Sequence, residues 1–297
     1  MILKANKELK QKDFKNEKEL QNFFENNIET ILGYKFIDTE FVVGDFRIDS
    51  LAFDEESKSF RIIEYKNVKN HSLVDQGYTY LKLMLERKAD FVLQYNIKTR
   101  SSLTTQDIDW SQSRIIFVAP IYTAYQLNAT DFKNIPVDLV KLTRYEDDII
   151  EIDFIKKTSN VKVQDIQMES IQNDVNKEII VYTEEDHLSK VSDNIKRVYE
   201  ELKNRILELD DIDVEAKKLY IAFKGIRNIA DIELHKNKLK IYINMKRGSL
   251  KDPLKLTKDI SGIGHWGNGD YCIIIDKKDD IDNVIPLIKQ SLKVNKK

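Results

Sequence analysis

The sequence predicts an α/β protein, with a mixed sheet that carries helices on its faces, followed by a smaller α+β domain. Three observations lead to this prediction. Short apolar runs typical of strands alternate with amphipathic helical stretches up to residue 157. Residues 158–185 lack a sustained apolar period, and a second series of helix and strand patterns fills residues 186–297. We therefore expect a first domain at 1–157, a linker at 158–185 and a second domain at 186–297.

The composition is that of a folded protein with a well-solvated surface. Of the 297 residues, 41% are hydrophobic and 33% are charged. No apolar run approaches the roughly 18 residues of a membrane span, and the N-terminus lacks the apolar core of a signal peptide. The single cysteine, Cys272, cannot form a disulfide within the chain. We expect a reducing, cytoplasmic location and no membrane partner.

Charge is distributed unevenly along the chain, whose net charge is -2. Residues 1–157 carry a net charge of -3, and residues 158–185 carry -4. Residues 186–297 carry 23 Lys and Arg against 18 Asp and Glu, which gives +5. A uniformly basic nucleic-acid binder is therefore excluded, and the last third alone offers a positive field to an anionic partner.

The first helix is expected to begin near Asn16, because Asn16 and Glu19 have the spacing of a capping box. Apolar residues then recur at helical spacing as far as Ile31, and Gly33 is expected to end the helix. Residues 90–97 are ambiguous between helix and strand. The remaining elements expected in this domain are a strand at 35–43 with a bend at Gly44, strands at 46–53 and 60–67, a helix at 72–88, a strand at 114–120, a helix at 122–132 and a hairpin of strands at 137–145 and 149–155.

The second domain opens with a strongly amphipathic pattern at 191–209, which predicts a helix. Just before it, residues 178–183 leave room for an additional strand. The elements expected to follow are strands at 218–224, 230–235 and 238–246, a short helix after Pro253, a strand at 271–276 and a closing helix at 281–293.

The two strands at 46–53 and 60–67 predict a β-hairpin around the polar segment Asp54–Ser59. If the turn is centred between Glu56 and Ser57, Phe53 faces Phe60 and Leu51 faces Ile62. The same register places Asp49 opposite Glu64. Lys66 lies two residues beyond Glu64 and projects from the same face.

This register brings two carboxylates together at the open end of the hairpin. Directly opposed residues hold their Cβ atoms about 4.5–5.5 Å apart, and opposed like charges are destabilising unless they are neutralised. A divalent cation between Asp49 and Glu64 would remove the repulsion. The alternative is an ordinary surface cluster of charges, since a third of all residues are charged.

The hairpin and the helix after it carry a motif. Asp49 is followed by Glu64-Tyr65-Lys66, and then by Gln76 and Tyr80 in the segment QGYTY. This arrangement resembles the PD-(D/E)xK, or restriction-endonuclease-like, nuclease superfamily, in the RecB-type branch whose helix carries a QxxxY pattern. The resemblance covers residues 14 to 120. One departure is Ile48, which stands where the family name has proline.

The resemblance implies a function for each residue of the motif. Asp49, Glu64 and the backbone carbonyl of Tyr65 would bind Mg²⁺ or Mn²⁺. Lys66 would be the catalytic lysine, which orients the attacking water and stabilises charge on the phosphate. Gln76 and Tyr80 would support the site or contact the substrate. The second domain resembles a small domain of unknown function that is found attached to such nuclease-like modules.

For several residues two interpretations stay open. Glu17 is either a first-turn acid favoured by the helix dipole or a third acid at the metal site. Arg47 either holds a phosphate or forms a salt bridge with Glu64 or Asp49. His71 is expected to be an exposed loop residue. The alternating segment 238–246, with its lysines and Tyr242 on one face, is either a nucleic-acid surface or a solvated lysine face. The loop SGIGHWGNGDY is expected to form tight turns, with His265 and Trp266 as structural residues or partner contacts.

The resemblance leads to a functional hypothesis. We expect a Mg²⁺- or Mn²⁺-dependent deoxyribonuclease that hydrolyses phosphodiester bonds, with the second domain recruiting substrate or a partner. DNA is the expected substrate, and RNA, a homodimer and a protein partner bound through the second domain stay open. The alternative hypothesis is a catalytically inactive nuclease-like fold that acts as an interaction module for nucleic acid or protein.

Overall fold

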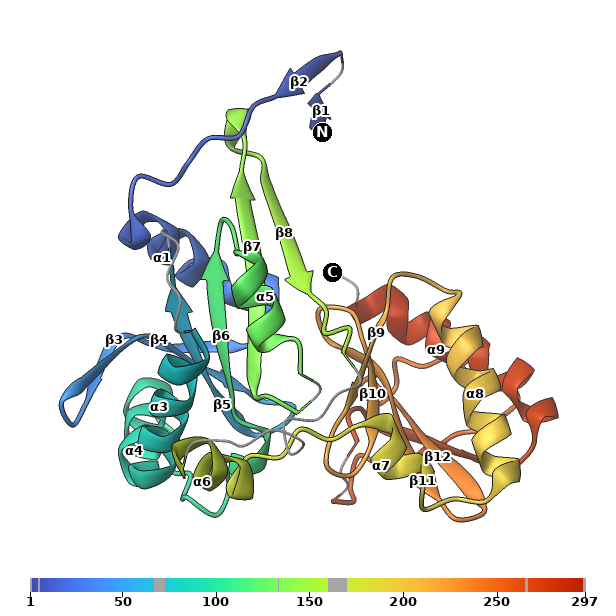
Figure 1. Cartoon of the computed structure of the whole chain (residues 1–297). Helices are drawn as coiled ribbons and strands as arrows, with labels where there is room; N and C mark the ends of the chain where they lie inside the picture. Colours follow the sequence, from blue (N-terminus) through green and yellow to red (C-terminus); the bar gives the residue numbers. More distant parts are fainter. Residues whose placement is uncertain are drawn as a thin grey trace. The chain divides into compact units, whose positions relative to one another are not determined.

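The computed structural model describes residues 2–4, 6–66, 73–132, 134–159, 170–264 and 267–295 (Figure 1). It divides into two compact units, Met1–Val181 and Tyr182–Lys297. The first is built on a mixed six-stranded sheet with helices on its faces, and the second on an antiparallel six-stranded sheet. The predicted fold class is confirmed.

In the first unit the six strands lie side by side in the order in which they occur in the chain. The pairs β5–β6 and β6–β7 are parallel, and the other pairs are antiparallel. A two-stranded hairpin, β1 (Ile2–Lys4) and β2 (Lys7–Leu9), precedes this sheet. The six strands are β3 (Lys35–Val43), β4 (Phe46–Asp54), β5 (Ser59–Tyr65), β6 (Arg114–Ala119), β7 (Val137–Arg144) and β8 (Ile150–Ile155).

Helices connect the parallel strands, because parallel neighbours require a crossover. Between β5 and β6 the chain forms α3 (Leu73–Glu86), α4 (Lys88–Thr99) and the 3₁₀ turn η1 (Trp110–Gln112). Between β6 and β7 it forms α5 (Ala124–Thr130), and η2 (Glu146–Asp148) joins β7 to β8. The ambiguous segment 90–97 is therefore helical.

The sheet has an apolar core on each face. On one face α3 and α4 pack over a cluster that includes Phe60, Phe91 and Phe117. On the other face α1 (Glu17–Glu25) and α2 (Ile28–Leu32) pack over a second cluster that includes Phe24 and Ile63. Both faces of the central strand β5 are thus buried, so a charged side chain on this strand must find its partners inside the protein.

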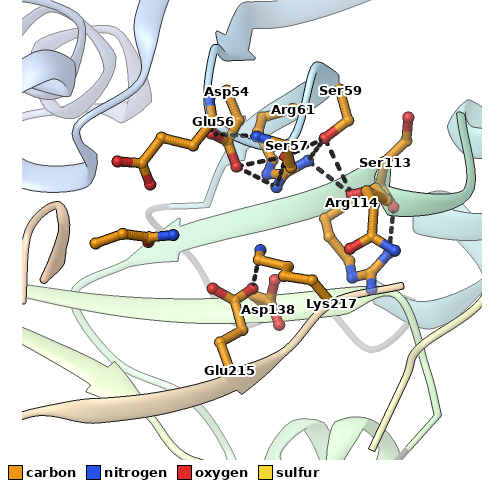
Figure 2. Close-up of polar contacts among 12 residues, drawn as sticks. Asp54, Glu56, Ser57, Ser59, Arg61, Ser113, Arg114, Asp138, Glu215 and Lys217 are labelled. Carbon is orange, nitrogen blue, oxygen red and sulfur yellow. Dashed lines mark hydrogen bonds and ion pairs between the residues drawn. The ribbon is translucent and has the colours of Figure 1, made fainter. Parts of the chain in front are cut away.

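The β4–β5 hairpin has the predicted register, with Phe53 paired to Phe60 and Leu51 paired to Ile62. A buried ion pair fixes its turn (Figure 2). The Asp54 carboxylate accepts hydrogen bonds from the backbone N–H groups of residues 56 and 57, and Arg61 Nη2 donates to Asp54 Oδ2 at 2.8 Å. A slip of one residue would leave this buried arginine without its carboxylate and would turn every side chain of the strand to the other face.

The first helix differs from its prediction. Asn16 is the N-cap, with its side chain accepting from the Glu19 N–H, and Gly33 ends the segment in a left-handed conformation with φ 72°. The apolar stripe is continuous, but the chain forms two helices, α1 and α2. The Asn27 side chain donates to the Phe23 carbonyl at 2.7 Å, a local bond that competes with regular helix at the junction.

The second unit carries its six strands in the order β13-β14-β12-β11-β10-β9, all antiparallel. Helices α8 and α9 bury their apolar stripes against strands of this sheet in one core that includes Val198, Leu202, Ile241 and Ile288. The elements are α7 (Glu184–Leu188), α8 (Asp193–Leu207), β9 (Asp213–Ala216), β10 (Ile221–Lys224), β11 (Asn228–His235), β12 (Lys238–Ile243), β13 (Lys258–Asp259), β14 (Tyr271–Ile275), η4 (Lys278–Asp280) and α9 (Ile281–Asn295).

The segment expected as a linker contains regular structure where it is described. Helix α6 (Ser170–Glu178) packs against α3, and Val175 and Ile179 belong to the core of the first unit. Residues 179–183 do not form the additional strand that the sequence allowed. A turn, rather than a short helix, follows Pro253, and the short strands β9 and β13 were not expected. Within the described residues, no helix combines the length and the apolar character needed to cross a membrane.

Candidate functional site

The hairpin brings Asp49 and Glu64 together at the edge where β4 begins and β5 ends. The paired residues of the ladder end at Ser50 and Ile63, and Asp49 and Glu64 are the next residues on the two strands. The Asp49 N–H donates to Glu64 Oε1 at 3.2 Å, and the Tyr65 N–H donates to Asp49 Oδ2 at 3.1 Å. Each carboxylate is therefore held by the backbone of the opposite strand.

Two further side chains reach the second oxygen of Glu64. Gln76 Nε2 donates to Glu64 Oε2 at 3.1 Å, and Lys66 Nζ lies 3.7 Å from the same oxygen. The Lys66 N–H donates to the Val118 carbonyl at 3.0 Å, which continues the parallel pairing with β6 and fixes the backbone beneath the ammonium. The Glu64 side chain is only 2% exposed and the Lys66 side chain 13%.

The electrostatics of this pair are unusual. Burial raises the pKa of Glu64 to about 8, with the Asp49 carboxylate as the second cause, although Lys66 acts in the opposite direction. Burial also raises the pKa of Asp49, against the hydrogen bond from Tyr65 and the charge of Lys66. The negative charges of Glu40 and Glu17 add to this rise. The single Lys66 ammonium does not neutralise the carboxylates of both Asp49 and Glu64. A further positive charge would therefore favour the state in which both are ionised.

Helix α3 links the carboxylate pair to the start of β4. Tyr80 lies one turn after Gln76, and its hydroxyl donates to the Arg47 carbonyl at 3.2 Å. Its ring meets the Phe46 ring edge-to-face, with 6.2 Å between centroids. Burial, followed by the charge of Glu64, raises the pKa of Tyr80. Gln76 and Tyr80 of the QGYTY segment therefore contact the two strands that carry the acids.

Arg47 and Glu17 lie at the rim of the site. Arg47 Nε is 2.8 Å from Glu40 Oε2, and its side chain is 67% exposed, so its ion pair is with Glu40 of β3 rather than with Asp49 or Glu64. Glu17 is exposed at the first position of α1, where its charge acts on Asp49. His71 and Ser72, the expected N-cap of α3, lie outside the described residues.

The donor set fits a hard divalent cation. Mg²⁺ takes oxygen ligands and typically uses one or two carboxylates together with waters and substrate phosphates. Asp49 and Glu64 offer carboxylate oxygens, and the raised pKa values show that their negative charges lack full compensation. Across the described part of the chain, no group of three or more His, Cys, Asp or Glu side chains is placed to share a metal ion. Asp49 and Glu64 are thus the two side-chain ligands expected for a cation here, and Glu17 as a third ligand stays a prediction.

Comparisons with known proteins concern both units. Residues 184–295 match a family model described as a domain of unknown function (DUF5655). The chain is also 47% identical over 289 residues to a Haemophilus influenzae protein called "Uncharacterized protein", with 96% of each chain covered. This chain belongs to the family of that protein. One solved structure, "Structure of EndoMS-dsDNA2 complex", matches 41% of this chain and 42% of its own at 19% identity and a TM-score of 0.26, which carries no argument about function.

In the DUF5655 region the lysine and tyrosine face of β12 is covered at Tyr242, whereas Lys238 and Lys246 of the same face are exposed. Tyr242 is fully buried, and its hydroxyl donates to Glu233 Oε2 at 2.8 Å. Gly267 lies so close to the ring that a Cβ there would come within 2.2 Å of it. Lys240 Nζ lies over the Tyr242 ring, 4.7 Å from its centroid. The glycine-rich loop therefore covers Tyr242, and a nucleic-acid role for the exposed lysines of this face stays a prediction.

The glycine-rich loop forms a tight turn, as predicted. Gly269 has φ +89°, and a Cβ there would lie 2.1 Å from the Ile243 carbonyl oxygen. The buried Asp231 carboxylate accepts from the Asn268 N–H at 2.6 Å and thereby anchors the loop to β11. His265 and Trp266 lie outside the described residues.

Two groups of residues near the site were not anticipated from the sequence. Glu40 lies opposite Asp49 at a break in the β3–β4 pairing. Its backbone is left-handed, with φ 51°, a conformation that is uncommon for residues other than glycine. Gln21, Glu25 and Ser50 form hydrogen bonds behind the carboxylates. The spacing of four between Gln21 and Glu25 placed them on one helix face, which was the available signal.

Proposed function

We propose that this protein is a divalent-metal-dependent nuclease that hydrolyses phosphodiester bonds of DNA with Asp49, Glu64 and Lys66. The observation that carries the proposal is the pair of adjacent carboxyl groups, Glu64 buried and Asp49 half-buried, both with raised pKa values and with a lysine beside them. Glu64 and Lys66 are both largely buried, and Glu64 Oε2 lies 3.7 Å from the ammonium. An uncompensated carboxylate pair lowers stability, so its presence inside a folded unit favours a functional role over a structural one.

Each residue has a role in this chemistry. Asp49 and Glu64 would hold Mg²⁺ or Mn²⁺ together with the Tyr65 carbonyl. When bound, the cation makes a coordinated water more acidic and polarises a phosphoryl oxygen. The Lys66 ammonium would stabilise the negative charge that builds up on the phosphate. Gln76 keeps Glu64 Oε2 oriented through its hydrogen bond, and Tyr80 ties α3 to β4 beside the substrate.

Part of the second unit would recruit the substrate. Residues 246–258 contain five basic residues and one acid, a net charge of +4, and the five basic side chains are exposed. Lysines that neutralise phosphates bind DNA without sequence preference and give a strong dependence on salt. A cytoplasmic location, in which the buried thiol of Cys272 stays reduced, belongs to the same proposal.

A digest of defined substrates tests the proposal. Purified protein is incubated with Mg²⁺, Mn²⁺ or EDTA and with single-stranded DNA, duplex DNA or RNA. Asp49→Asn and Lys66→Ala are the active-site variants. Lys88→Ala is the matched control, because Lys88 pairs with Glu178 in the same unit without touching the carboxylates. The proposal is supported if wild type and the control cleave DNA in a metal-dependent way and both active-site variants do not.

Two results would contradict it. Equal cleavage by wild type and Lys66→Ala would indicate a contaminating nuclease. DNA binding that survives both EDTA and Asp49→Ala, with no cleavage of any substrate, would favour the non-catalytic interaction module instead.

A further inference from the structure

Two residues adjacent in sequence to the site residues have side chains that point away from the site. Ser50 directly follows Asp49, and Tyr65 lies between Glu64 and Lys66. Because successive side chains of a strand alternate between faces, Ser50 and Tyr65 project from the opposite face of the sheet, beneath α1. Both are buried, at 0% and 1% exposure. The Tyr65 ring packs edge-to-face on Phe24 of α1, with 5.8 Å between centroids.

Hydrogen bonds join these two residues to α1. The Ser50 hydroxyl donates to Glu25 Oε1 at 2.6 Å. Its oxygen is 3.0 Å from the Tyr65 hydroxyl, which must be the donor there because the single Ser50 proton goes to Glu25. Gln21 Nε2 donates to the same Glu25 oxygen at 2.9 Å.

The network closes on the residue that carries the first acid. Gln21 Nε2 also donates to the Asp49 carbonyl at 2.9 Å, and Gln21 is itself only 4% exposed. The chain of bonds thus runs from the backbone of Asp49 through α1 to Ser50 and then across to Tyr65 on β5. It connects the two peptide segments of the site from behind.

We propose that Gln21 and Glu25 are positioning residues for the candidate site and act through Ser50 and Tyr65; this inference rests on the proposed function. When both are ionised, as metal binding requires, Asp49 and Glu64 repel one another, so their strands need a restraint that does not use the carboxylates. A connected and largely buried hydrogen-bond network supplies such a restraint, because a member that turns away leaves the buried Ser50, Tyr65 or Gln21 without a partner. The network also fixes Tyr65, whose carbonyl is an expected ligand.

Removal of one hydroxyl tests the inference. Tyr65→Phe keeps the ring and deletes the bond to Ser50. Tyr122→Phe is the matched control, since its hydroxyl donates to the Phe117 and Val140 carbonyls of the same sheet and touches none of the network. Mn²⁺ affinity is measured on the full chain without DNA, from the signal of free Mn²⁺ in electron paramagnetic resonance. Cleavage rate at saturating Mn²⁺ and DNA affinity are measured separately.

Loss of a partner that orients a metal ligand typically costs about 10–100-fold in metal affinity or activity. We expect a loss of that size for Tyr65→Phe, an unchanged DNA affinity, and wild-type values for Tyr122→Phe. Ser50→Ala should also lower Mn²⁺ affinity. The double variant Ser50→Ala/Tyr65→Phe should lose no more affinity than the more affected of the two single variants, because both substitutions break the same chain of bonds.

A second pair of variants, at Glu25, tests the inference if the substitutions at the fully buried Ser50 and Tyr65 prevent folding. Glu25 is partly exposed, and Glu25→Gln keeps an oxygen that accepts from Ser50 and Gln21, whereas Glu25→Leu does not. We expect Glu25→Gln to restore Mn²⁺ affinity relative to Glu25→Leu. If Tyr65→Phe and Glu25→Leu match the control in affinity and rate, the positioning role is wrong and the nuclease proposal stands. If wild type neither binds Mn²⁺ nor cleaves, both proposals fail.

Discussion

Substitution of Glu64 by glutamine should stabilise the first unit at high pH while it abolishes activity. Glu64 has a pKa of about 8 in the folded protein, against an ordinary value of 4.5. Between these values the folded state keeps a proton that the unfolded chain has lost. The stability that this proton contributes is fully present below pH 4.5 and is lost as pH rises through about 8. At 1.36 kcal/mol per pKa unit, the loss is about 3–5 kcal/mol.

Glutamine has nearly the same shape as a protonated glutamate and carries no charge at any pH. Its amide oxygen can still accept from the Asp49 N–H, and the Gln76 amide can turn to present its oxygen. Glu64→Gln should therefore match wild type near pH 5 and exceed it by about 3–5 kcal/mol above pH 8. For a unit of this size, that difference corresponds to a shift in Tm of roughly 6–20 °C.

Tryptophan fluorescence provides the assay. Trp110 and Trp266 are the two tryptophans of the chain, so in a Trp266→Phe background Trp110 reports on the first unit. Urea unfolding in EDTA is followed between about pH 5 and pH 8.5 for both proteins, which spans the expected window. Added Mn²⁺ should raise the stability of wild type at high pH more than that of Glu64→Gln. Parallel stability curves for the two proteins over the whole pH range would refute the reasoning.

Three further predictions concern other charges. Lys66→Ala should reduce the cleavage rate about 10²–10³-fold with little change in DNA affinity, and a rate within a factor of two of wild type would contradict the role of the ammonium. Arg61→Ala should lower the free energy of unfolding of the first unit by about 3–5 kcal/mol in the Trp110 assay, because it removes the positive charge that neutralises the buried Asp54 carboxylate, and a loss below about 1 kcal/mol would contradict this. Lys251, Lys255 and Lys258 are exposed lysines of the second unit, and replacing all three by glutamate should reduce the slope of log affinity for DNA against log salt by about 2–3. Cleavage at saturating DNA should not become slower. An unchanged slope would exclude these lysines from phosphate contact.

The hairpin could be predicted because its register depends on local sequence. The apolar residues around Leu51 and Ile62 and a polar turn of fixed length determine which residues pair, and the Asp49–Glu64 contact follows from that pairing. Residues that contact a neighbouring element could not be placed in this way. Arg47 pairs with Glu40 on β3, a strand outside the hairpin, and the left-handed backbone of Glu40 had no signal in the sequence.

The second unit illustrates the same limit. The alternation in β12 correctly placed Ile241 and Ile243 in the core. It could not show that Tyr242, on the other face, is covered by a loop more than twenty residues later in the chain. A period of two identifies the two faces of a strand, but what covers each face depends on contacts distant in sequence.

The two ends of the hairpin present a contrast that bears on function. At the turn, Arg61 and Asp54 are buried at 2% and 5% exposure and neutralise one another. At the open end, the buried Glu64 and the half-buried Asp49 bring two carboxyl groups together, and the pKa of each is raised. The same pair of strands therefore contains one charge cluster that is complete within the protein and one that is not. A structural role accounts for the first. The second, when both carboxyl groups are ionised, lacks a positive charge that a bound cation would supply under the proposed function.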